Sequence, residues 1–294
     1  MYNIKNCYRV VIQLNFKRFI CRKEVIIPLS VVLALALVFA ILCLGEAYNA
    51  KSEIHWTPDY EKTDIQPLLE KSKLTEDDYA LLFEQTGLTK IGIDDLLSVG
   101  DTDRILTIQS NYFEEQIPIN EKFAPFSQLQ LIGGRTTLTN LEDGDIIVSS
   151  STFVSWFRCG HAAIVVDGGK GLLLNAVTPG ENSIIVGLSE FNSRVNFMVL
   201  RPKLSKEERA AAAAYAKENL KDKPYDLTVG LLSKKYKEEI RGTHCAHSVF
   251  AAYKSIGIDL DSNGGAVVTP KDIANSEHLE LVQTFGFNPE KYWK

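Results

Sequence analysis

The sequence is poor in two features that would define its class, cysteine and clustered positive charge. Its 294 residues hold five cysteines, too few for the disulfide framework of a small secreted scaffold. Cys7, Cys21 and Cys43 fall in the N-terminal tail and the apolar run after it, which leaves Cys159 and Cys245 for the rest of the chain. An oxidising compartment would permit one disulfide between those two.

Positive charge is scarce beyond the N-terminus. The net charge is −5, but six basic residues against Glu24 give residues 1–45 about +5, which leaves the remainder at about −10. Proteins that bind a phosphate backbone use clustered Lys and Arg, which release counterions. The acidic body therefore excludes nucleic acid as the expected partner. The length allows one good-sized core and a smaller accessory region.

One apolar run, Val25 to Leu44, contains no charge and has the length of about 20 residues that a helix needs to cross a bilayer. The basic residues precede it, so the positive-inside rule predicts a cytoplasmic tail at 1–24, a transmembrane anchor at 25–45 and an extracytoplasmic domain at the cell membrane. The alternative is a cleaved signal peptide and a secreted domain. The long basic region and the length of the apolar run favour the anchor.

Residues 46–125 are predicted to form a linker followed by a small helical region. Thr75 is a suitable N-cap for a helix that Gly87 ends. Further helices are expected over 93–100 and 105–113. This region contains no set of residues that indicates chemistry, and we expect it to pack against the domain that follows.

Short β-rich runs begin near Asp143 and are separated by Gly, Asn and Pro, a pattern that predicts an antiparallel meander. The runs are residues 145–150, 161–168, 170–177, 182–188 and 196–202. A capping-box pattern at Ser205 and Glu208 predicts a helix to residue 220. A last amphipathic helix begins at Cys245. The expected fold is α+β, with an antiparallel sheet packed against the cysteine helix.

Three residues in this region suggest nucleophilic catalysis. Cys245 lies in the first turn of a helix, where the dipole and unpaired N–H groups stabilise a thiolate and can receive an oxyanion. His161 opens a strand, and its imidazole can accept the thiol proton. Asn175, in the next strand, could orient that imidazole. Each residue also has a structural explanation: a buried cysteine, a surface histidine and an asparagine that bonds its own backbone.

Five segments, in order, resemble the circularly permuted papain-like amidases of the YiiX type, relatives of the NlpC-like cell-wall peptidases and of lecithin:retinol acyltransferase-like enzymes. They are LEDGDIIV (141–148), GHAAIVVD (160–167), KPYD (223–226), HCAHSVFAAYKSIG (244–257) and TPKDIA (269–274). The resemblance covers residues 126–294 and implies a permuted papain-like catalytic domain.

The resemblance implies roles for five residues. Cys245 would be the nucleophile, His161 the base and Asn175 the residue that orients the base. Tyr225 would line the site near the oxyanion, and His244 would contact substrate or oxyanion. The sequence departs from the family at Asn175, where glutamate is common, at His244, where an aromatic residue often stands, and after the cysteine, where Ala-His replaces Ser-Glu.

The main hypothesis is therefore an exported cysteine hydrolase that cleaves amides, with cell-wall peptide as one substrate. A lipid acyl hydrolase or acyltransferase is an alternative, supported by the apolar loop 149–158. A non-catalytic binding module on the same fold is another, supported by His244 and His247. Zinc is disfavoured because the Cys and His spacings match common zinc sites poorly. No metal and no cofactor are expected.

Overall fold

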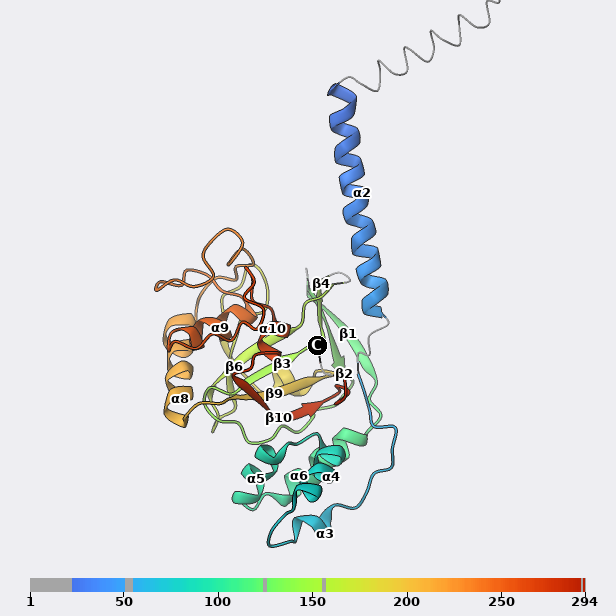
Figure 1. Ribbon diagram of the computed structural model, residues 1–294, viewed down its shortest axis with the longest axis vertical. Helices are drawn as coiled ribbons and strands as arrows, with labels where there is room; N and C mark the ends of the chain where they lie inside the picture. Colours follow the sequence, from blue (N-terminus) through green and yellow to red (C-terminus); the bar gives the residue numbers. More distant parts are fainter. Residues whose placement is uncertain (1–22, 51–54, 124–125, 155–156, 292, 294) are drawn as a thin grey trace, which may run out of the picture. The chain divides into compact units, whose positions relative to one another are not determined.

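The computed structural model describes residues 23–50, 55–123, 126–154, 157–291 and 293 (Figure 1). They belong to two compact units, residues 1–52 and 53–294, which we describe separately. Among the residues that the structure describes, the first unit shows the helix α2 (Lys23–Ala50), with Pro28 near its start. The predicted basic tail lies outside the described residues except where α2 begins.

The prediction of a transmembrane anchor at 25–45 is wrong. Within the ranges that the structure describes, no helix is long and apolar enough to cross a membrane. The side chains described in α2, residues 26–41, are exposed and mainly apolar.

The second unit begins with a helical region that has its own apolar core. It contains α3 (Gln66–Leu69), α4 (Glu76–Thr86), α5 (Lys90–Ser98) and α6 (Thr102–Phe113). Thr75 caps α4 through a capping box with Asp78, and Gly87 ends it at a φ of 69°. Leu82, Ile93 and Ile105 are fully buried between the helices. The three helices expected in this region are therefore present.

A six-stranded antiparallel sheet forms the centre of the second unit, in the order β10-β9-β3-β6-β7-β8. The bounds are β3 (Ile146–Ser149), β6 (His161–Asp167), β7 (Leu172–Asn175), β8 (Ile184–Gly187), β9 (Phe197–Pro202) and β10 (Leu279–Phe285). The α+β class and the antiparallel sheet are as predicted, but the strands do not form a simple meander. Strand β9 pairs with β3 inside the sheet and is buried at every residue. Strand β8 is exposed at its ends and forms an edge of the sheet.

A second sheet of four strands was not predicted. Its order is β1-β2-β4-β5, with β1 (Pro118–Phe123), β2 (Phe126–Leu131), β4 (Thr152–Val154) and β5 (Phe157–Arg158). The apolar segment expected as a loop at 149–158 therefore contributes two strands to it. Trp156 of that segment lies outside the described residues.

Helices cover one face of the six-stranded sheet. They are α8 (Lys206–Tyr215), which continues as the π-helix η1 (Ala216–Leu220), α9 (Cys245–Lys254) and α10 (Pro270–Ala274). Figure 1 shows α8 and α9 next to each other beside the sheet. Alternate residues of β6, such as Ala162 and Ile164, face this helical layer. The opposite face packs on α7 (Ser189–Asn192), where Phe191 is fully buried.

Candidate active site

Cys245 is the first residue of α9, the position expected from the sequence. Helix α9 packs on β6, and the cysteine is 8% exposed at the edge of the apolar core. His244 is the N-cap, and its Nδ1 accepts the backbone N–H of His247 at 3.4 Å. The sulfur therefore lies where the unpaired N–H groups of a helix N-terminus concentrate positive potential.

His161 is the first residue of β6, and the structure places Asn175 beside it. The distance between His161 Nε2 and Asn175 Oδ1 is 2.6 Å, and both side chains are buried. The two residues share a face of the sheet because β6 pairs with β7 with Ile164 opposite Leu174. An amide oxygen only accepts hydrogen bonds, so Nε2 carries the proton and Nδ1 is left as an acceptor. This is the tautomer that a general base requires.

Two aromatic residues fix the position of the His161 ring. The ring stacks on Phe191, with centroids 5.5 Å apart and planes inclined by 24°. The preceding Gly160 has a φ of 70°, and a Cβ there would lie 2.1 Å from the Trp293 ring. Only glycine fits without rearrangement, so the chain enters β6 in one conformation.

His161 is held in its neutral form. Burial and, to a smaller extent, the positive charge of Arg194 lower its pKa from 6.5 to about 3, and the bond to Asn175 opposes the shift. A neutral imidazole at neutral pH is able to take up a proton. The tautomer suits a general base, whereas a pKa this far below neutral makes the buried imidazole a weak one.

Burial raises the pKa of Cys245, and several groups oppose that shift. The backbone N–H groups of Ala162 and Ala246 and the charge of Arg194 favour the thiolate. Because Ala162 follows His161 in β6, the sulfur lies at the same end of this strand as the imidazole, but the His161 side chain alternates to the other face of the sheet, where it stacks on Phe191. Among the described residues, Cys245 Sγ and the His161 ring make no direct hydrogen bond. Catalytic hydrogen bonds are often long in unliganded sites.

Tyr225 lies close to both cysteines of this unit. Burial raises its pKa, and negative charge on Cys245 or Cys159 would raise it further. Its ring packs edge-on against Phe126, with centroids 6.1 Å apart. The pKa of Cys159 is raised to about 12 by burial and by the neighbouring Cys245, and its Sγ donates to the Thr152 carbonyl at 3.4 Å. Cys159 is therefore a poor nucleophile beside Cys245.

Arg194 was not predicted from the sequence. Its side chain is only 1% exposed, pairs with Glu190 at 2.8 Å and donates to Thr152 Oγ1 at 2.8 Å. Its guanidinium lies over the ring of Phe191, 4.8 Å from the centroid, on which His161 also stacks. This buried cation favours both a neutral His161 and an ionised Cys245. A single arginine in a polar segment gives no sequence signal for this role.

The two histidines that flank Cys245 differ in how their ring nitrogens are used. Both ring nitrogens of His247 have hydrogen-bond partners, Thr243 Oγ1 at 2.9 Å and the Lys235 carbonyl at 2.8 Å. His244 is buried, and its Nε2 has no hydrogen-bond partner among the described residues. The described residues include no group of three or more His, Cys, Asp or Glu side chains placed to hold a metal ion. His247 is therefore structural, whereas His244 has an unused polar atom beside the nucleophile.

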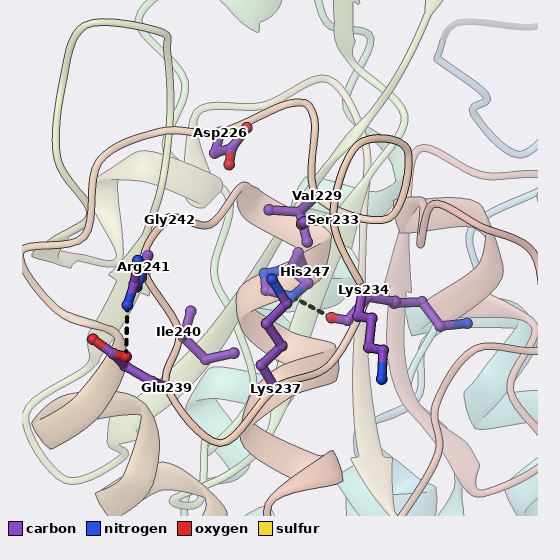
Figure 2. A pocket seen from close by; sticks show the side chains of 11 residues that line it. Asp226, Val229, Ser233, Lys234, Lys237, Glu239, Ile240, Arg241, Gly242 and His247 are labelled. Atoms are coloured by element: carbon purple, nitrogen blue, oxygen red, sulfur yellow. Dashed lines mark hydrogen bonds and ion pairs between the residues drawn. The ribbon is translucent and has the colours of Figure 1, made fainter.

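A pocket of about 480 Å³ lies next to this first turn of α9 (Figure 2). It is formed largely by the loop 226–242, with His247 at its side. Figure 2 shows the bonds from His247 to the Lys235 carbonyl and from Arg241 to Glu239. The volume is in the usual range for small-molecule sites, which is about 300–1,000 Å³.

Comparisons with known proteins give one distant relative and no family. No family profile matches the chain, and no solved structure matches it. The uncharacterized protein YycO of Bacillus subtilis (strain 168) is 24% identical over 179 residues, which are 56% of this chain and 66% of that protein. The chain thus spans just under two thirds of that relative. Its name assigns no activity.

Proposed function

We propose that the protein is a cysteine hydrolase of the amidase or peptidase type. The observation that carries this proposal is the His161–Asn175 hydrogen bond of 2.6 Å at the start of β6, the strand on which the Cys245 helix packs. A nucleophile, a base and a residue that orients the base are the parts of a Cys-His-Asn site. The ordered resemblance of residues 126–294 to permuted papain-like amidases supports the same proposal.

Catalysis would begin with transfer of the Cys245 thiol proton to His161 Nδ1. The thiolate then attacks the substrate carbonyl carbon, a C–S bond forms, and the carbonyl oxygen becomes an oxyanion. Backbone N–H groups in the first turn of α9 are positioned to stabilise this charge. The Tyr225 hydroxyl, close to the sulfur, is a second candidate donor.

Collapse of this intermediate would break the C–N bond. His161 returns its proton to the leaving amine, and the acyl group stays on Cys245 as a thioester. His161 then deprotonates a water molecule, which attacks the thioester and releases a carboxylic acid and the thiol. The His161–Asn175 bond would keep Nδ1 available in both halves of this cycle.

We further propose that the substrate is an external amide, with cell-wall peptide as the first class to test. This follows from the resemblance to cell-wall peptidases. It also follows from reading the basic and apolar N-terminal segment as an export signal whose cleavage would secrete the domain.

A second candidate is acyl transfer or lipid acyl hydrolysis through the same thioester. The side chain of Phe157, in β5 just before Cys159 and Gly160, is 59% exposed, and an exposed aromatic ring near the site suits an apolar acyl chain. Comparing an ester probe of long acyl chain with an amide probe of a short peptide would separate the two functions by their kcat/KM values.

The test of catalysis uses the two cysteines of the second unit as a matched pair. In the full-length protein with Cys7, Cys21 and Cys43 replaced by serine in every variant, Cys245→Ala should abolish turnover of both probes and remove labelling by iodoacetamide near neutral pH. Cys159→Ala should retain both. Turnover that survives Cys245→Ala, in a protein that is still folded by circular dichroism, would exclude the nucleophile and favour a binding module.

A further inference from the structure

The loop 226–242, which leads into α9, exposes three leucines in a short stretch of chain. Leu227, Leu231 and Leu232 are 50%, 66% and 83% exposed. Leu232 is the most exposed large apolar side chain that the structure describes. Single exposed leucines are common on protein surfaces, but three at one tip form an apolar feature that needs an explanation.

The chain around this tip is held in place. The backbone N–H groups of Leu231 and Leu232 both donate to the Thr228 carbonyl at 2.9 Å. Gly230 has a φ of 89°, and a Cβ there would lie 1.9 Å from the Ala266 carbonyl oxygen, so only glycine fits between the tip and the segment beneath it. The leucines therefore project from an ordered turn that bonds its own backbone.

The base of the loop is fixed to the body of the unit as well. The backbone carbonyl of Lys235 accepts a hydrogen bond from His247 of α9. The ammonium group of Lys235 pairs with the buried Asp261 and donates to the Gly265 carbonyl. Such anchoring prevents the leucines from folding back onto the core. Their exposure is thus a property of the native structure.

Lysines lie beside the leucine tip, followed in the same loop by the exposed Glu238 and by Glu239, which pairs with Arg241. Lys234 and Lys237 line the pocket behind it and are exposed, and among the described residues neither has an acidic partner (Figure 2). Exposed leucines beside unpaired lysines are the pattern of a segment that enters a membrane interface, where the apolar groups reach the acyl chains and the cations meet anionic headgroups.

We propose that the loop 226–242 docks the second unit onto the surface of an anionic lipid bilayer, with Leu231 and Leu232 inserted at the interface and Lys234 and Lys237 at the headgroups. Charge complementarity favours this occupant, because two lysines that have no acidic partner among the described residues lie next to exposed leucines and match anionic headgroups above an apolar layer. The contact is peripheral and involves no membrane-spanning segment. It goes beyond the proposed catalytic function and does not depend on it.

The experiment places a tryptophan at the tip of the full-length protein and measures quenching by vesicles of brominated phosphatidylglycerol and phosphatidylcholine. Leu231→Trp is compared with Val99→Trp, since both side chains are 66% exposed in the native protein. Val99 ends α5, close to Asp94 and Asp101 rather than lysines. The three native tryptophans and helix α2 are common to both variants, so the difference reports the tip alone. We expect strong quenching at position 231 and little at position 99.

A second arm tests the charges. In the Leu231→Trp protein, Lys234→Gln with Lys237→Gln should weaken quenching by phosphatidylglycerol vesicles roughly fivefold per lysine, with little change for pure phosphatidylcholine. Equal quenching at positions 231 and 99 would overturn the proposal. So would a concentration-dependent blue shift of the Leu231→Trp emission without vesicles, because it would show that a second copy of the chain covers the tip.

Discussion

Two groups of polar side chains lie beside the six-stranded sheet, and they differ in how completely their hydrogen bonds are satisfied. The Arg201 cluster consists of Arg201, Asp145 and Asp95. Arg201 in β9 makes bonds of 2.9 and 2.8 Å to the two carboxylate oxygens of Asp145, and its remaining nitrogen bonds Asp95 of α5 at 2.6 Å. Every nitrogen of this guanidinium therefore has an acceptor.

The His161 cluster, which we define as His161, Asn175, Arg194, His244 and Cys245, is less complete. Asn175 Nδ2 and His244 Nε2 are buried and have no hydrogen-bond partner among the described residues. Unsatisfied buried polar groups are costly, and native proteins retain them mainly where they serve a function. The Arg201 cluster thus joins the helical region to the sheet with its hydrogen bonds complete, whereas the His161 cluster retains two buried polar atoms without a partner among the described residues.

The largest effect is expected from removing the base of the His161 cluster. His161→Gln keeps a polar group beside Asn175 but cannot accept and return a proton, so turnover should fall by about a thousandfold or more. The free energy of unfolding should change by only about 1 kcal/mol. Steady-state kinetics and urea unfolding measure the two quantities. His278→Gln, on a partly exposed histidine outside the site, is the control and should leave both unchanged.

Breaking the Arg201 cluster should instead lower the free energy of unfolding strongly. Asp145→Asn removes the bidentate partner of a buried guanidinium, and uncompensated buried charges typically cost about 3–5 kcal/mol. Glu76→Gln, at the exposed ion pair with Lys90, is the matched control and should cost about 0.5 kcal/mol or less. A small loss of stability in Asp145→Asn would contradict the structural role assigned to this cluster.

The difference between the clusters also bears on what could be predicted from the sequence. Periodicity and capping residues were sufficient for the helices at Thr75, Ser205 and Cys245 and for strands β3, β6, β7, β8 and β9, but not for β4 and β5. β1 was missed because its residues, PINEKF, have no apolar alternation, and β10 because it pairs across a long sequence separation. The transmembrane prediction counted only the uncharged run, and no helix among the described residues is long and apolar enough to cross a membrane.

Within the site, local sequence patterns suggested which residues take part, but not how burial and neighbouring charges change their pKa values. The proximity of His161 and Asn175 follows from the pairing of consecutive strands, so the sequence could suggest it. Arg194 could not be found in this way, since its contacts with Thr152 and Phe191 and its effect on Cys245 arise from packing between separate segments. The burial that lowers the pKa of His244 is likewise a tertiary property.

A smaller effect is expected on the free energy of unfolding in mild acid. His161, His244 and His247 are all buried, and burial lowers their pKa values. In the unfolded chain they titrate near 6.5, so below that pH the unfolded state binds more protons than the folded state and stability falls. Each histidine contributes a slope of up to about 1.4 kcal/mol per pH unit. Urea unfolding between pH 7 and pH 5, above the range of carboxylates, should show this loss, and His244→Gln should flatten it.

The smallest effect isolates the electrostatic role of Arg194 in the His161 cluster. Arg194→Met retains an apolar chain over Phe191 but removes the charge that lowers the pKa values of both His161 and Cys245. The pH at which iodoacetamide labels Cys245 half-maximally should therefore move upward. Arg194→Lys should restore part of the shift, since a cation is present again, although without the planar group that reaches Thr152. An unchanged labelling profile in Arg194→Met, in a protein of undiminished stability, would mean that the N–H groups at the start of α9 determine the reactivity of the thiol without the arginine.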